Sequence, residues 1–179
     1  TNYPPIISLI YAYEYWLYDH KYLLAQLHNI IKLYPSEFIE YFYKYGYILL
    51  LKLPAIIADL GLSILIYKLV FKYTKSFVKS VAGLSLYLLN PVTILLSSIW
   101  GQTDSLIALL SILSFILLLR KKFAWAMIFY FASLYIKPNW IYFLPLFVFS
   151  FLYLKPKLKD IIFGILATFL IFYLTTSPF

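Results

Sequence analysis

The polar residues Trp100-Gly101-Gln102-Thr103-Asp104-Ser105 form a dense cluster inside an otherwise apolar part of the chain. An indole ring such as that of Trp100 can stack on a sugar ring, and the Gln102 amide can hydrogen-bond its hydroxyl groups. Such a cluster at the end of a membrane span is costly unless water, protein or a polar ligand satisfies it. We therefore take Trp100 and Gln102 as candidate substrate-binding residues. Asp104 is either the N-cap of the apolar helix that follows or a supporting catalytic residue.

Two further motifs combine polar side chains with proline. Lys137 precedes Pro138 at the end of an apolar run, where a cation either favours a helix C-terminus or binds the phosphate of a lipid-linked donor. Tyr3 precedes two prolines, which restrict two successive φ angles and favour an extended backbone. That motif either stiffens the entry to the first helix or shapes a substrate site. Lys137 and Tyr3 are thus further candidates for substrate binding.

Lys52 and Asp59 are charged residues inside one long apolar run. At a separation of seven residues they share a helix face two turns apart, so they do not pair with each other. Lys52 can extend its charge to the outer membrane surface. Asp59 falls near mid-membrane, where a charge must face the bundle interior and have a partner. We interpret both as structural intramembrane residues, with a catalytic role for Asp59 as the alternative.

Several classes of chemistry are excluded or lack a motif. The chain has no Cys, so thiol catalysis and Cys-based metal binding are excluded. His20 and His28 are interpreted as interfacial polar residues, because no spacing of His, Asp and Glu forms a metal site. We therefore predict no metal. No GxSxG, Walker A, GxGxxG or HExxH motif occurs.

The composition is that of a membrane protein. Hydrophobic residues make up 64% of the chain, charged residues 12%, and the mean hydropathy is +0.86, against about 45–50% and about 25% in soluble domains. The aromatic content of 22% suits a protein with much surface at lipid–water interfaces. The net charge of +8 comes from residues in short loops between apolar runs, which indicates membrane topology and not nucleic-acid binding. We predict an integral, multi-pass protein whose main partner is the lipid bilayer.

The chain divides into two parts of different composition. Residues 1–45 hold four of the seven acids and both histidines, and we expect an extracytoplasmic loop with interfacial amphipathic helices, one over 6–17 and one over 36–45. Residues 46–179 are expected to form an all-α, polytopic transmembrane bundle. Its six expected spans are 46–70, 77–89, 105–119, 123–136, 140–154 and 161–174.

Three basic clusters follow alternate spans, and the positive-inside rule assigns them to the cytoplasm. They are Lys68, Lys72, Lys75 and Lys79; Arg120, Lys121 and Lys122; and Lys155, Lys157 and Lys159. Residues 1–45, the loop 101–104 and the turn 137–139 then share the opposite side. Every candidate substrate-binding residue is therefore predicted to be extracytoplasmic.

In the order of these motifs the chain resembles the GT-C superfamily of membrane glycosyltransferases. The closest likeness is to the glucosyltransferases of N-glycan assembly and to related prokaryotic mannosyltransferase-like proteins. The motifs that carry it, over nearly the whole chain, are Tyr3-Pro4-Pro5; Lys52-x-Pro54 with Ala58-Asp59; Asn90-Pro91 with Trp100-Gly101-Gln102-x-Asp104-Ser105; and Lys137-Pro138 with Leu144-Pro145.

The resemblance implies a partial GT-C fold and the transfer of a hexose outside the cytoplasm. The donor would be a polyprenyl-phosphate-linked sugar, with no other cofactor, and the acceptor a lipid- or protein-linked glycan. The membrane would be the plasma membrane of a prokaryote or the endoplasmic reticulum membrane of a eukaryote. Inverting members use an acid that precedes the Tyr-Pro-Pro motif as general base. We therefore expect the base upstream of Thr1 and the present chain to be a fragment that is inactive alone.

The sequence leaves two alternatives to an enzyme open. In a transporter or flippase, Lys52 and Asp59 would line a path across the membrane. That function predicts helices broken by Gly or Pro and an inverted repeat, and we find no repeat in the sequence. The other alternative is a non-catalytic assembly subunit that retains the fold.

Overall fold

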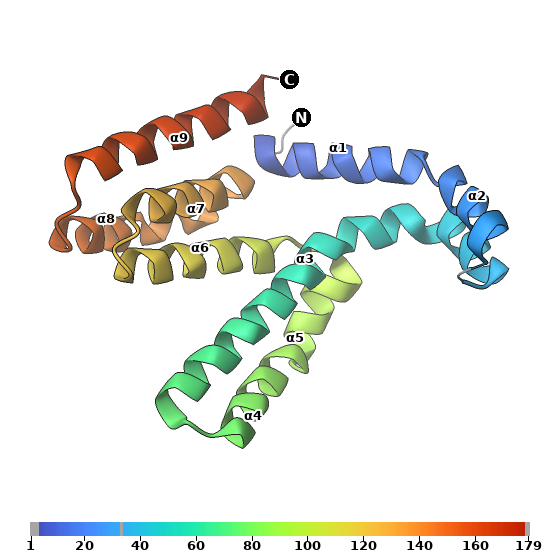
Figure 1. The fold of residues 1–179 in the computed structure, drawn as a ribbon, viewed down its shortest axis with the longest axis horizontal. Helices are drawn as coiled ribbons and strands as arrows, with labels where there is room; N and C mark the ends of the chain where they lie inside the picture. The colour runs from blue at the N-terminus through green and yellow to red at the C-terminus, as the bar shows by residue number, and fades with distance from the viewer. Residues whose placement is uncertain (1–3, 33, 178–179) are drawn as a thin grey trace.

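The computed structural model describes residues 4–32 and 34–177, and every regular element in this part of the chain is helical (Figure 1). The all-α expectation is therefore confirmed. In chain order the elements are α1 (Pro5–Asp19), α2 (Tyr22–Ile31), α3 (Ser36–Thr74), α4 (Phe77–Leu88), α5 (Pro91–Thr93), η1 (Ile94–Trp100), α6 (Asp104–Leu119), α7 (Phe123–Ile136), η2 (Pro138–Phe143), α8 (Leu144–Tyr153) and α9 (Leu158–Thr176).

Two helices, α3 with 39 residues and α9 with 19, are long and apolar enough to cross a membrane. The segment formed by α4, α5 and η1 would be a third span if its two halves, bent by 43°, cross together. The apolar helices α6 and α7 and the η2–α8 segment are shorter than a typical span. These features are those of a membrane protein.

Helix α3 is longer than the sequence predicted. We expected an interfacial helix over 36–45 and a separate span from 46, but one helix runs from Ser36 to Thr74. It begins after Pro35, which has an extended backbone. Gly46 does not interrupt this helix. The absence of a side chain at Gly46 leaves room for the Phe42 ring, since a Cβ there would lie 2.8 Å from Cδ1 of Phe42. The prediction of a separate helix is therefore wrong, and the predicted boundary between residues 45 and 46 falls inside α3.

The stretch from Asn90 to Gly101, which lies between the expected spans 77–89 and 105–119, is largely helical. The Asn90 side chain accepts a hydrogen bond from the Val92 N–H at 2.9 Å, and Pro91 occupies the first helical turn, so a new helix begins here. It continues as the π-helix η1 and ends at Gly101, whose φ of 76° is left-handed. Glycine adopts this conformation without steric cost, so the chain can turn sharply into α6.

Prolines also shorten the helix expected over 140–154. A 3₁₀ segment, η2, begins at Pro138, and α8 begins only at Leu144 with Pro145 in its first turn. Proline is accepted in a first helical turn but would interrupt a helix interior. The α-helix is therefore only 10 residues long.

Two apolar clusters hold the elements near the candidate site together. The larger lies among α6, α7 and α8, where the rings of Tyr130 and Phe147 are stacked with their centroids 4.3 Å apart. The smaller joins Ile7 of α1 to Ile107 of α6 and Ile136 of α7. Helix α1 is thereby fixed across the start of α6 and the end of α7.

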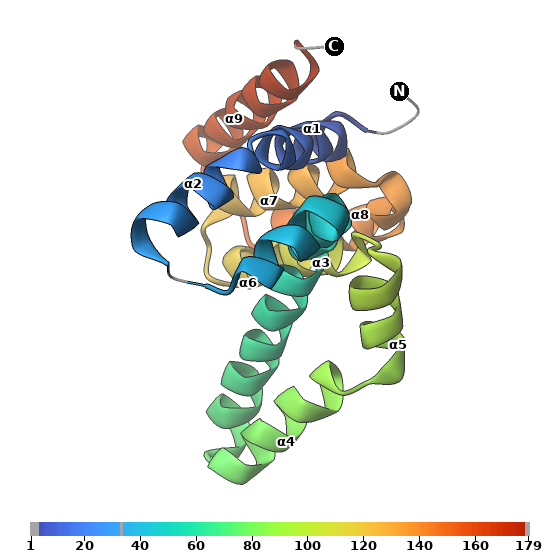
Figure 2. The same ribbon diagram turned by 90° about the vertical axis from the view of Figure 1, so that its right-hand side faces the viewer.

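Helices α3 and α6 approach closely at one point and then diverge. A Cβ on Gly61 would lie 3.0 Å from Cδ2 of Leu109, so the absent side chain permits this approach. Beyond it, the hairpin of α3 and α4 points away from the layer formed by α6 to α9 (Figures 1 and 2). The molecule thus has two arms that meet near the start of α6.

Candidate functional site

The centre of the candidate site is an ion pair between two of the predicted residues. Nζ of Lys137 lies 2.7 Å from Oδ1 of Asp104, and the two side chains are 39% and 43% exposed. Asp104 begins α6 and Lys137 directly follows α7. We predicted both residues without pairing them. The signal was available, because in an antiparallel helix pair the start of the first helix lies beside the end of the second.

The backbone explains why these two side chains meet. Lys137 has an extended conformation, with φ −158° and ψ 123°, because the residue before a proline disfavours the helical region. Helix α7 therefore ends at Ile136. Thr103, not Asp104, occupies the cap position of α6, and no side chain there makes a cap hydrogen bond. The predicted N-cap role of Asp104 is wrong, although its charge in the first turn still suits the helix dipole.

Three other predicted residues lie near this end of the molecule. The stem of Lys52 packs against the turn before α6, since a Cβ on Gly101 would lie 3.2 Å from Cγ of Lys52. The Gln102 N–H donates to the Leu96 carbonyl at 2.8 Å, which fixes the turn. The Trp100 side chain is 68% exposed and so is free to stack on a ligand. Tyr3 lies outside the described residues.

Asp59 lies apart from the ion pair and holds two helices together. It is 5% exposed, and its Oδ1 accepts a hydrogen bond from the Tyr87 hydroxyl at 2.8 Å. Its predicted position, facing the interior with a partner, is confirmed. A small cavity of about 70 Å³ adjoins it, lined by Ile56, Asp59, Leu60, Leu88, Thr93, Ile94 and Ser98. Asp59 therefore joins α3 to α4.

Glu14 of α1 is a candidate that the sequence analysis missed. It is 5% exposed, and neither carboxyl oxygen has a hydrogen-bond partner among the described residues. Burial raises its pKa from 4.5 to about 7. The residue was interpreted only as part of an acidic, interfacial segment. Its position relative to Ile7 and Ile10 was the available signal, because these three residues share one helix face.

Glu14 lines an apolar groove of about 590 Å³. The groove lies between α1 and α3 and reaches the first turn of α6 at Leu106, two residues beyond Asp104. Its lining residues are Ile6, Leu9, Ile10, Tyr13, Glu14, Leu17, Leu50, Leu53, Pro54, Ile57 and Leu106. The apolar face predicted over 6–17 thus forms one wall. A hydrocarbon chain suits this groove, with one carboxyl group available to bind a hydroxyl or to exchange a proton.

Within the described residues, no group of three or more His, Asp or Glu side chains could hold a metal ion. No family model matches the chain, and no curated protein or solved structure is detectably similar to it. The features of the chain that bear on function are therefore the ion pair, the apolar groove and the order of the sequence motifs.

Proposed function

We propose that this chain takes part in transferring a hexose from a polyprenyl-phosphate-linked donor to a lipid- or protein-linked acceptor at the extracytoplasmic face of a membrane. The observation that carries the proposal is the partly exposed Asp104–Lys137 pair at the start of α6, the same helix turn that contributes Leu106 to the apolar groove. A donor of this kind has a phosphate, a sugar and a long hydrocarbon chain. The site offers a cation, exposed polar and aromatic groups, and an apolar groove.

In this proposal Lys137 binds the donor phosphate. Its ammonium group has three N–H donors, of which one is directed to Asp104, so the others are free for phosphate oxygens. During transfer the acceptor hydroxyl gives its proton to the general base and its oxygen bonds to the anomeric carbon, while the bond from that carbon to the phosphate oxygen breaks. The electron pair stays on the phosphate, and Lys137 stabilises the charge that develops there. Asp104 is a positioning residue that holds the ammonium group in place.

The remaining residues bind the other parts of the two substrates. Trp100 and Gln102 would contact the sugar, and the groove would hold the polyprenyl chain. Glu14 is the described carboxyl group whose pKa of about 7 suits proton exchange at neutral pH, and we assign it contact with the acceptor. The general base itself is proposed to precede Thr1, as the resemblance to GT-C enzymes implies.

The proposal includes a multi-pass topology in the plasma membrane or the endoplasmic reticulum membrane. The three basic clusters would lie in the cytoplasm and the ion pair on the other side. Helices α6, α7 and α8 would cross as short helices packed among longer ones.

The test is transfer from radiolabelled polyprenyl-phosphate hexose by membranes that contain the complete protein. We expect Asp104→Asn to lower kcat/KM at least about tenfold, or about 1.4 kcal/mol, with a raised KM for the donor. The amide keeps the size of the side chain but loses the charge that holds Lys137. Expression and thermal stability should stay close to those of the wild type.

Asp160→Asn is the matched control. Asp160 is also an acid in the first turn of a helix, α9, but it has no ion-pair partner among the described residues. Transfer should be unchanged in this variant. Wild-type transfer by Asp104→Asn would refute the proposed role of the ion pair. Absence of transfer by the wild-type protein would instead favour a non-catalytic subunit.

One observation favours a transporter as a second candidate. The α4–η1 segment is bent by 43° at Asn90-Pro91, and the cavity beside Asp59 adjoins this break. Broken helices near a membrane-embedded charge are typical of transporter sites. Reconstituted protein that moves a lipid-linked sugar between leaflets, without transferring the sugar, would support this function against the first.

A further inference from the structure

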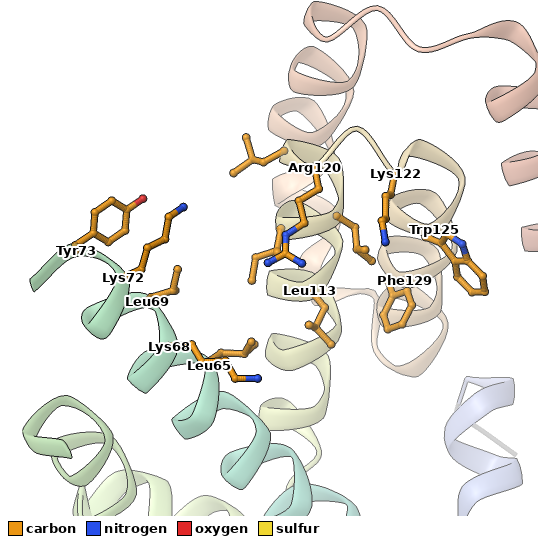
Figure 3. Close-up of a pocket in the computed structure, with 13 residues that line it drawn as sticks. Leu65, Lys68, Leu69, Lys72, Tyr73, Leu113, Arg120, Lys122, Trp125 and Phe129 are labelled. Carbon is orange, nitrogen blue, oxygen red and sulfur yellow. The ribbon is translucent and has the colours of Figure 1, made fainter. Parts of the chain in front are cut away.

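A second large cavity lies at the opposite end of α6 from the Asp104–Lys137 pair. It is a cleft of about 660 Å³ between the C-terminal half of α3, the end of α6 and the start of α7 (Figure 3). The residues that line it are Leu65, Lys68, Leu69, Lys72, Tyr73, Leu113, Ile116, Leu117, Leu119, Arg120, Lys122, Trp125 and Phe129. We call it the basic cleft, because its charged residues are all cations.

The basic cleft opens from the point where α3 and α6 approach at Gly61 and Leu109. One turn beyond that point the walls are apolar, with Leu65 on α3 and Leu113 on α6. Residues three or four apart share a helix face, so the same two faces carry Lys68 and Arg120 further along. The cleft therefore changes from apolar at its inner end to cationic at its mouth.

The cations of the basic cleft have no acid to balance them. Among the described residues the only ion pair is that of Asp104 and Lys137, so Lys68, Lys72, Arg120 and Lys122 have no carboxylate within salt-bridge distance. Figure 3 shows the Lys68 and Arg120 side chains projecting into the space between the two helices. Like charges repel across such a space unless an anion lies between them.

We propose that the basic cleft binds an anionic phospholipid, with its phosphate among these cations and its acyl chains against the leucines. The charge at the mouth and the apolar inner walls together match a lipid that carries a negative head group. Clusters of basic residues between membrane helices favour such head groups. A soluble anion would leave the apolar walls unoccupied. The proposal depends on the apolar spans of the chain and is independent of the proposed transferase activity.

Trp125 lines the basic cleft and is 54% exposed, which makes it a reporter for the lipid. The other three tryptophans, Trp16, Trp100 and Trp140, are changed to Phe. The purified protein is placed in phosphatidylcholine nanodiscs and titrated with phosphatidylglycerol that carries brominated acyl chains, which quench indole fluorescence on contact. Brominated phosphatidylcholine serves as the neutral reference. We expect phosphatidylglycerol to quench Trp125 at a much lower mole fraction than phosphatidylcholine does.

A charge variant and a matched control test the cause of this preference. Lys68→Gln, Lys72→Gln and Arg120→Gln combined should weaken the preference for phosphatidylglycerol at least about tenfold, because each basic residue contributes to head-group attraction. Lys155→Gln, Lys157→Gln and Lys159→Gln combined remove three charges from outside the cleft and should leave it nearly unchanged. An equal loss in both variants would indicate general surface attraction and would overturn the proposal.

Two further outcomes would also overturn it. Equal quenching by the two lipids would show that the cleft does not select charge. Suppression of the effect by inorganic phosphate at millimolar concentration would indicate a site for soluble anions. If the tryptophan variants fold poorly, native mass spectrometry of the chain with all four tryptophans replaces them. We then expect phosphatidylglycerol to stay bound to the protein, and only the substitutions in the basic cleft to reduce the amount bound.

Discussion

Glu14 is the ionisable residue outside the long spans whose environment most changes its chemistry. Burial stabilises the neutral carboxyl group, so the pKa rises to about 7 in the folded protein from 4.5. The folded state therefore binds more protons than the unfolded state between about pH 4.5 and 7. Stability contributed by this group is fully present below pH 4.5 and is lost as the pH rises to about 7.

Glu14→Gln should remove this pH dependence. The amide is neutral at every pH. We therefore expect the melting temperature of the variant, relative to that of the wild type, to rise between pH 4.5 and pH 8. Thermal unfolding in detergent at a series of pH values measures the difference. Glu37→Gln is the control, because Glu37 is an exposed acid in the first turn of α3. A constant offset between Glu14→Gln and the wild type at all pH values would contradict the assigned burial.

At the residue scale the sequence singled out Asp59, Asp104 and Lys137 as candidates, but it did not predict their contacts and it missed Glu14. The position of Asp59 inside an apolar run predicted that it needs a partner, because an unpaired charge in a membrane interior is costly. It did not name Tyr87, because a contact over 28 residues depends on how α3 and α4 pack. The same reason explains why Asp104 and Lys137 were predicted separately. Their pairing needs the antiparallel arrangement of α6 and α7.

At the scale of elements, the Asp59–Tyr87 hydrogen bond joins α3 to α4. Tyr87→Phe removes the donor and leaves a buried acceptor, which should cost about 1–3 kcal/mol of stability. Asp59→Leu should lower stability or yield by breaking the same contact. In the double variant the two losses should be less than additive, since both remove one interaction. Chemical unfolding in detergent gives the four free energies of the cycle.

Tyr73→Phe is the control for this cycle. Tyr73 is near the end of the same helix α3 but is 77% exposed, so its loss should change stability by less than about 0.5 kcal/mol. Strict additivity of Asp59→Leu and Tyr87→Phe would show that the hydrogen bond contributes nothing. Normal stability with a loss of turnover alone would instead favour a catalytic role for Asp59.

Helix boundaries were predictable where proline or a clear apolar run marks them. The expected span over 123–136 has the bounds of α7, because Lys137 precedes Pro138 and cannot continue a helix. The break expected near Gly46 did not occur, because glycine weakens a helix by only about 1 kcal/mol. The Phe42 ring, one turn earlier on the same helix, occupies the space that a side chain at position 46 would need. This contact cannot be predicted from the helix propensities of single residues.

At the scale of the whole molecule, the three basic clusters lie at helix ends that share one backbone feature. Lys75, Lys121 and Lys155 each adopt a left-handed backbone, with φ of 54°, 58° and 53°, directly after α3 or in the turns that follow α6 and α8. Left-handed residues commonly end helices, and cations there suit the helix dipole. The positions of the basic residues in the sequence predicted that these turns lie at the opposite helix ends from Asp104 and Lys137. The two-armed shape was not, because it depends on the close approach of Gly61 to α6.

This arrangement makes a topological prediction that a thiol probe can check. The chain has no cysteine, so Thr103→Cys and Lys121→Cys each introduce a single reactive site. If the basic turns are cytoplasmic, a membrane-impermeant maleimide should label Thr103→Cys in intact cells, or in inverted microsomal vesicles for a eukaryotic host. Lys121→Cys should react only from the cytoplasmic side, because its turn carries three positive charges and is retained there. Reaction of Lys121→Cys after detergent permeabilisation controls for reactivity, since this position is exposed. Labelling of Lys121→Cys from the same side as Thr103→Cys would place both ends of α6 on one membrane face, and the multi-pass proposal would then be wrong.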